Sequence, residues 1–232
     1  MKLSSFAFIA GATLAAVTAS SANATVYIAY SYGGGPVTLA AWDPTDATWA
    51  ATLAPNLKVT TTSGSAGTYP SVLDSTASVR YTGGPGPAPL ALDIFVTVDN
   101  LTSILAKFDS GLTENVLVGN WSVTESTFVS ASNALYGGTL LATKTFGGPS
   151  SQTATFDSLS GNWNLTGPFS VTHQYHIVAP TSGPTSLALS TISVNANAVP
   201  EPAVWAMMLG GFGLAGLSLR TRAAKVRAGY TA

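Results

Sequence analysis

A two-residue period recurs along most of this chain and is the strongest constraint on its fold. In LDIFVTV, apolar residues occupy every second position from Leu92 to Val98, and FSVTHQYHI continues a similar alternation from Phe169 to Ile177. Such alternation turns one face of a strand toward a core and the other toward solvent. Further runs of strand length are NVLVGNWSV, TLLATKTF, TATFDSL and TSLALSTISV.

Glycine and proline clusters separate these runs and mark turns. No segment between the two ends of the chain has a helical period. Many short strands with regular turns are typical of an antiparallel β-sandwich. The sequence therefore predicts an all-β, jelly-roll-like sandwich over residues 25–194 and a linker over 195–199. The turn clusters lie at 33–36, 83–89, 137–138, 147–149, 161–162 and 182–184.

The N-terminus has the parts of a secretory signal peptide. Lys2 supplies a positive charge, residues 6–17 form an apolar run, and Ala22 and Ala24 frame an A-x-A cleavage site. The strand-like sequence VYI begins just beyond this site. We therefore predict a signal peptide over residues 1–24, its removal by the general secretion machinery, and a mature chain that starts at Thr25.

A second apolar run lies over residues 203–219 and contains no charged residue. As a helix it would be about 25 Å long, slightly short of the ~30 Å hydrocarbon core of a bilayer. A basic tail over 220–227 follows, whereas residues 25–199 hold four basic and nine acidic residues, a net charge of −5. Positive charge beside an apolar run holds that side in the cytoplasm. We predict a transmembrane helix over 203–219, stopped by Arg220, Arg222, Lys225 and Arg227.

A PEPxxWA pattern overlaps the start of this run. It consists of Pro200, Glu201, Pro202, Trp205 and Ala206. The two prolines fix φ and keep the peptide extended, in a form that a protease cleft could bind as a strand. Followed by an apolar helix and a basic end, this motif resembles the PEP-CTERM sorting signal over residues 200–227. The same tail is also catalogued as an ice-binding protein C-terminal region.

The resemblance implies a partner and a route. PEP-CTERM tails are substrates of exosortase, a membrane protease that is thought to cleave near the motif. The protein would pass through the inner membrane of a Gram-negative bacterium and continue to the cell surface or extracellular matrix. The resemblance covers only the C-terminal tail and implies nothing about the body of the chain.

The body offers no clear catalytic constellation. There is no cysteine, which excludes disulfides, thiol nucleophiles and thiolate metal sites. His173 and His176 form an H-x-x-H, but an odd spacing on a strand sends the two rings to opposite faces. Only 8% of the residues are charged, which argues against nucleic acid as a partner. We expect no enzyme activity, no cofactor and no metal.

Four aspartates leave an alternative open. Asp43 and Asp46 in WDPTD, or Asp93 with Asp99, could supply carboxylates to calcium or to a glycosidase pair. Capping of a loop is the commoner use of an aspartate before proline. Loop capping is therefore the preferred interpretation of the first pair.

Aromatic residues support a binding hypothesis, because their rings can stack on sugars. Packing into the core is the more frequent role of such residues in a sandwich without cysteine. Ice binding would need a flat, regular threonine array, and TKT, TAT and TTT are scattered along the sequence. The six aromatic residues are Trp42, Trp49, Trp121, Trp163, Tyr136 and Tyr175.

These features predict an exported, transiently membrane-anchored β-sandwich that acts as a structural or adhesive protein of the envelope or of a biofilm matrix. Exopolysaccharide is then a candidate partner. The alternative is a carbohydrate-binding or glycan-hydrolysing ectodomain that uses the acids and the tryptophans.

Overall fold

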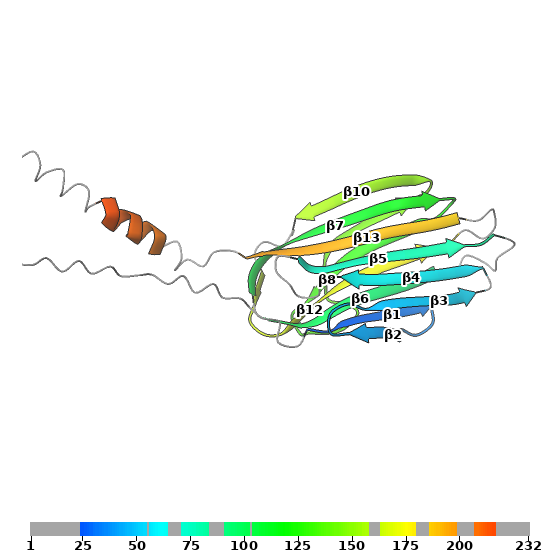
Figure 1. Cartoon of the computed structure of the whole chain (residues 1–232), viewed down its shortest axis with the longest axis horizontal. Coiled ribbons are helices and arrows are strands. Elements are labelled where there is room, and N and C mark those ends of the chain that lie inside the picture. The colour runs from blue at the N-terminus through cyan, green and yellow to red at the C-terminus, as the bar shows by residue number, and fades with distance from the viewer. Residues whose placement is uncertain are drawn as a thin grey trace, which may run out of the picture.

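The computed structural model describes residues 24–54, 56–64, 71–83, 91–102, 104–157, 163–179, 186–198 and 207–216. Most of the predicted signal peptide, the PEPxxWA motif at 200–206 and the basic tail at 220–227 lie outside these residues. The described part of the chain is mostly β-strand (Figure 1). The strands are β1 (Val26–Tyr32), β2 (Thr38–Asp43), β3 (Thr48–Ala54), β4 (Leu57–Gly64), β5 (Ser71–Tyr81), β6 (Ala91–Leu101), β7 (Ile104–Val118), β8 (Ser122–Ser130), β9 (Thr139–Gly147), β10 (Ser150–Asp157), β11 (Trp163–Leu165), β12 (Phe169–Val178) and β13 (Ser186–Ala198).

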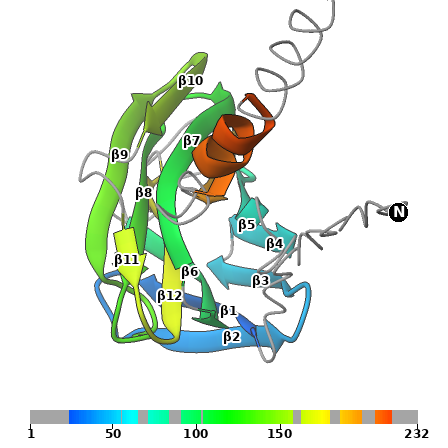
Figure 2. The ribbon, with the colours of Figure 1, turned by 90° about the vertical axis from the view of Figure 1, so that its left-hand side faces the viewer.

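The strands form two antiparallel sheets. Sheet A has the order β2-β1-β6-β12-β8-β9, and sheet B has the order β10-β7-β13-β5-β4-β3, with β11 also paired to β7. Figure 2 shows the two sheets from one end. The predicted all-β, antiparallel architecture is confirmed at this level.

The core consists of the alternating residues that the sequence pattern places on one face. On β6, Ile94, Val96 and Val98 are fully buried, and their neighbours on β1, Val26 and Ile28, are buried against them. All members of the core cluster lie between Ala24 and Ala196. Apart from Ala24, the described core is therefore formed entirely by residues within 25–198.

Polar side chains also join the two sheets inside the core. The Tyr175 hydroxyl on β12 donates to the Ser75 carbonyl oxygen at 2.7 Å and accepts from the Ile192 N–H at 3.2 Å. The Ser75 hydroxyl lies 2.7 Å from Nδ1 of His173. Because these partners belong to opposite sheets, the hydrogen bonds fix how one sheet lies over the other.

The C-terminal part differs in detail from the sequence-based expectation. Strand β13 continues to Ala198, so four of the five residues expected to form the linker 195–199 pair as strand. Residues 207–216 form a helix with exposed side chains. Of the helices in the described ranges, none has the length and apolar character needed to cross a membrane.

Two acidic residues in the core were not singled out from the sequence. Glu114 lies on β7 in sheet B and Glu125 on β8 in sheet A, and both residues are fully buried between the sheets. Neither carboxyl oxygen of Glu125 has a hydrogen-bond partner of regular geometry among the described residues. Burial raises the pKa of Glu125 to about 8; Glu114 adds to the rise, whereas the Ser190 hydroxyl and the Thr113 amide offset part of it. Glu125 is therefore protonated in the folded protein at neutral pH.

Other groups around Glu125 are neutral or point away. His173 and Tyr175 are fully buried beside it; burial lowers the pKa of His173 to about 3 and raises the pKa of Tyr175. Lys144 on β9 is the register partner of Glu125, but its side chain is exposed. Ionisation of Glu125 would thus place a charge in the core beside these neutral groups and the buried Glu114.

We expect the stability of the fragment 25–199 to fall as the pH rises from about 5 to 8. In this window the folded state holds a proton on Glu125 that the unfolded chain, with its carboxyl pKa near 4.5, has released. The free energy of unfolding should decrease by on the order of 1 kcal/mol per pH unit. Glu125→Gln, which mimics the protonated acid, should remove most of this slope in urea unfolding curves.

The matched control is Asp46→Asn, because Asp46 is an exposed acid. This variant should keep the slope of the wild type. An unchanged slope in Glu125→Gln would show that the pH dependence arises elsewhere.

Candidate functional site

The outer face of sheet A carries a group of aromatic side chains from three strands and a loop. We call Tyr27, Trp42, Phe95 and Tyr136 the aromatic face. Tyr27 on β1 pairs in register with Trp42 on β2 and with Thr97 on β6, so all three point away from the core. Trp42 is 63% exposed, whereas the other three rings are half-buried.

Tyr136 belongs to the loop between β8 and β9, which folds over this face. Its φ of 61° lies in the left-handed region, which is strained for a residue with a bulky side chain. Its backbone N–H donates to the Thr97 hydroxyl at 3.3 Å, and its ring centroid lies 6.0 Å from that of Phe95. Asn133 and Asn100 exchange hydrogen bonds of 2.9 and 2.8 Å and fasten the loop to β6.

Hydrogen-bonding groups lie next to the aromatic face on the same side of sheet A. Asp93 on β6 accepts from the Gln174 amide at 3.2 Å, and its carboxylate lies 2.8 Å from Nδ1 of His176. Gln174 pairs in register with Phe95, and His176 with Asp93. The arrangement places a carboxylate, an amide and an imidazole within a few residues of four rings.

Rings beside fixed polar groups can bind a polyhydroxylated chain. The C–H face of a sugar packs on an aromatic ring, and its hydroxyls bond to side chains such as those of Asp93 and Gln174. Burial, together with the Asp99 carboxylate, raises the pKa of Tyr27, and burial raises the pKa of Tyr136. Both phenols therefore remain neutral hydrogen-bonding groups at neutral pH.

Most of the other aromatic candidates belong to the core. Trp121 is 2% exposed and its indole N–H donates to the Val118 carbonyl at 3.1 Å. Trp49 stacks on Tyr30 at 4.7 Å between ring centroids, and Trp163 packs edge-on against a core phenylalanine. Together with the buried Tyr175, these residues fit the core interpretation. Trp42 is the clear exception.

The histidines and acids lie where simple strand geometry puts them. His173 is fully buried, and His176 lies on the outer face, as the odd spacing predicts. Asp43 accepts from the backbone N–H groups of Asp46 and Thr45 and from the Thr45 hydroxyl, and these bonds lower its pKa. The loop-capping interpretation of this aspartate is confirmed.

The second pair of aspartates is spread along one strand. Asp93 and Asp99 are six residues apart on the same face of β6, a separation of about 20 Å. A glycosidase pair requires roughly 5–10 Å. Asp99 instead accepts from the backbone N–H of Thr25, the expected first residue of the mature chain, at 3.2 Å.

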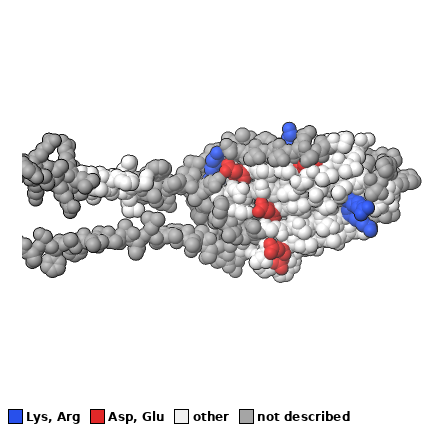
Figure 3. All heavy atoms as spheres, turned by 45° about the horizontal axis from the view of Figure 1, so that its top comes forward, with Lys and Arg blue, Asp and Glu red and all other residues white. Residues whose placement is uncertain are grey.

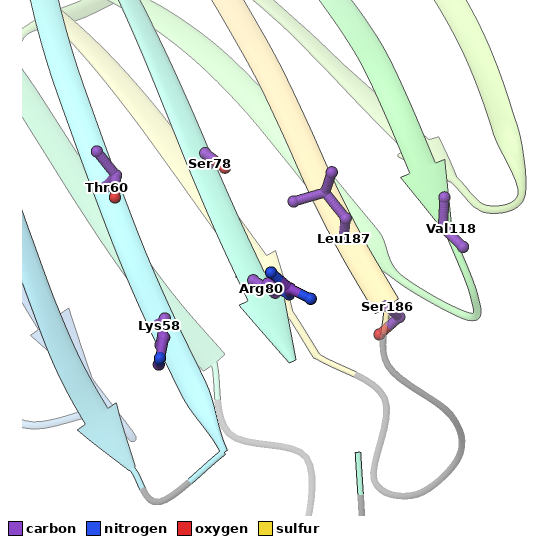
Figure 4. Close-up of a pocket in the computed structure, with 7 residues that line it drawn as sticks. All are labelled: Lys58, Thr60, Ser78, Arg80, Val118, Ser186 and Leu187. Carbon is purple, nitrogen blue, oxygen red and sulfur yellow. The ribbon is translucent and has the colours of Figure 1, made fainter. Parts of the chain in front are cut away.

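A groove lies on the outer face of sheet B, at the ends of β4, β5, β13 and β7 (Figure 4). It has a volume of about 480 Å³. Lys58 and Arg80 are direct register partners across β4 and β5, and both are exposed. Sequence analysis did not single them out. The lining residues are Lys58, Thr60, Ser78, Arg80, Val118, Ser186 and Leu187.

Sheet B also brings together threonines that are scattered in the sequence. The register pairs them across neighbouring strands, so a row of threonines crosses the outer face of the sheet. Within the row, the Thr76 and Thr191 hydroxyls lie 3.1 Å apart, and Asn115 donates to Thr191 at 2.7 Å. We call this row the threonine ladder. In strand order it is Thr48, Thr62, Thr76, Thr191 and Thr113.

Solved structures show only distant likeness to this chain. The adhesin domain of Epf from Streptococcus pyogenes is 10% identical, with 75% of this chain and 60% of that chain covered and a TM-score of 0.35. A family 11 carbohydrate-binding module from Clostridium thermocellum, in complex with a β-1,3-1,4-mixed-linked tetrasaccharide, is 12% identical. The match covers 75% of this chain and 98% of that chain, with a TM-score of 0.31. TmCBM61, in complex with β-1,4-galactotriose, is 7% identical. The match covers 52% of this chain and 71% of that chain, with a TM-score of 0.31. At these TM-scores the likenesses carry no information on function.

Sequence comparison is informative only at the C-terminus. A search of curated proteins gave no match. Residues 198–223 match the PEP-CTERM protein-sorting motif, which includes the positions from Pro200 to Ala206 that carry the resemblance. The chain therefore carries a PEP-CTERM sorting signal, which indicates an exported protein that exosortase sorts.

Proposed function

We propose that the exported domain is a non-catalytic adhesive module of the cell surface or extracellular matrix, and that it holds a polysaccharide along the aromatic face. The exposure of Trp42, at 63%, is the observation that carries this proposal. The other tryptophans in the described residues are packed against the core, whereas Trp42 offers its ring to solvent beside Tyr27. A large exposed ring in a group of aromatic side chains is typical of a binding surface.

The neighbouring polar groups support a sugar as the ligand. Gln174 and His176 both bond to Asp93, so the positions of the three side chains are fixed before a ligand arrives. Preorganised groups lose less conformational entropy on binding. The wide separation of Asp93 and Asp99 favours binding without hydrolysis.

The sorting signal supports the location that we propose for this activity. Export would begin with removal of residues 1–24, after which the segment 203–219 would hold the protein in the inner membrane. Exosortase would then act near the PEPxxWA motif and release the domain toward the surface or a biofilm matrix. An adhesive domain at that location would have polysaccharide as its neighbour.

Substitution of Trp42 tests the binding surface. We expect the fragment 25–199 to be retained on at least one neutral polysaccharide of a glycan array. In affinity electrophoresis on that polymer, Trp42→Ala should weaken binding about tenfold or more, because stacking on the exposed ring is lost. Trp42→Phe, which keeps a ring, should retain part of the affinity.

Val116→Ala is the matched control, because Val116 is an exposed apolar residue on the outer face of sheet B. It should bind like the wild type. The proposal fails if no neutral polymer retains the fragment, or if Trp42→Ala binds as well as Val116→Ala.

Substitutions in the tail test the sorting route in the native bacterium. Replacement of Pro200, Glu201 and Pro202 by alanine leaves the apolar segment intact, so uncleaved protein should accumulate in the inner membrane. Replacement of the four basic residues by serine should instead let a fraction reach the periplasm unprocessed. Immunoblots of cell fractions report size and compartment together. Normal maturation of the alanine variant would contradict the proposed role of the motif.

A further inference from the structure

The groove on sheet B contains an arrangement of charge that the fold itself does not require. Lys58 and Arg80 stand directly opposite each other on neighbouring antiparallel strands, whose backbones are about 5 Å apart. Like charges at such positions destabilise a sheet. Residues 25–199 contain only four basic residues, and two of them form this pair.

No acid among the residues that the structure describes relieves the repulsion. Within the described ranges, no carboxylate forms an ion pair with Lys58 or Arg80, whereas Lys107 lies 3.9 Å from Asp109. Figure 3 shows one face of the molecule, on which charged residues are few. Both cations are exposed, and the described part of the chain provides no carboxylate counter-ion for them.

The rest of the groove is suited to a sugar. Leu187 on β13 and Val118 on β7 form an apolar side, and Thr60 and Ser78 carry hydroxyls on the same outer face as the cations. Figure 4 shows Arg80 beside Ser78 and Leu187, with Lys58 on the next strand. Apolar contact with C–H groups and hydroxyls for hydrogen bonds are what a pyranose ring uses.

We propose that this groove is a second glycan site, in which Arg80 and Lys58 bind the carboxylate of an acidic sugar within a polysaccharide. The guanidinium of Arg80 can bond both oxygens of a carboxylate, and the ammonium of Lys58 adds a second charge-assisted bond. The site is chemically distinct from the aromatic face and lies on the opposite sheet. One domain could then hold two chains, or two parts of one chain.

The charge of the domain makes a local site necessary for this binding. Residues 25–199 carry a formal net charge of −5, or −4 with Glu125 protonated, so the overall field repels a polyanion. Retention on an acidic polymer therefore has to come from a local concentration of positive charge. The Lys58–Arg80 pair is such a concentration, because these two basic residues are direct register partners.

The test uses the fragment 25–199 and two forms of one polymer. Polygalacturonate has a carboxylate on each sugar, and its fully methyl-esterified form keeps the backbone without the charge. In affinity electrophoresis at low salt, the wild type should bind polygalacturonate at least tenfold more tightly than the ester. The double variant Lys58→Gln/Arg80→Gln should lose this preference. Added salt should weaken wild-type binding, because ion pairs at the surface are screened.

The matched control is Lys107→Gln/Lys144→Gln, which removes the same charge from the other two basic residues of the domain. It should keep the preference to within about twofold. Equal losses in both double variants would mean that net charge alone governs binding and would overturn the proposal, as would a wild type that does not distinguish the acid from the ester.

Two further measurements distinguish a loss of binding in the groove from a loss of folding and from an effect of the aromatic face. Thermal unfolding of Lys58→Gln/Arg80→Gln should occur at or above the wild-type temperature, because a repulsion is removed. Trp42→Ala should keep its preference for the acidic form. If the groove does not bind an acidic sugar, the proposal for the aromatic face is unaffected. If the aromatic face does not bind a polysaccharide, the proposal for the groove is unaffected.

Discussion

Burial of alternate side chains between two sheets is the constraint on which the other features of this molecule depend. On β6, Val96 and Val98 face the core, so Phe95 and Thr97 have to face outward. A slip of one residue would exchange these sets and expose the core. The aromatic face, the groove and the threonine ladder are thus placed by the same packing that excludes water from the interior.

The polar groups inside the core make this packing more specific. Apolar contacts between two sheets tolerate small sliding movements, whereas the bonds of Tyr175 to Ser75 and Ile192 have defined directions. The Ser110 and Thr127 hydroxyls, 2.8 Å apart, form another contact between the sheets. Glu125 follows the same geometry but lacks regular partners, and so it adds a dependence on pH to the stability of the sandwich.

Local sequence patterns were enough for some features and not for others. The alternation in FSVTHQYHI predicted a strand and the opposite directions of His173 and His176, because both follow from the geometry of one strand. The partnership of Trp42 with Tyr27, and that of Lys58 with Arg80, depend on which strands become neighbours. A single sequence does not specify which strands pair, since many strand topologies are compatible with the same alternation of apolar and polar residues. For the same reason threonines that look scattered in sequence become a ladder.

The position of β13 has a mechanical consequence. This strand lies between β7 and β5, pairs with both, and ends at Ala198, where the match to the sorting motif begins (Figure 1). A pull on the C-terminal segment would therefore act along a central strand and load the hydrogen bonds on both of its sides at the same time. Bonds loaded together in shear resist force far better than bonds that open one after another. The sorting signal is thus joined to the domain through a strand that is held by hydrogen bonds on both sides.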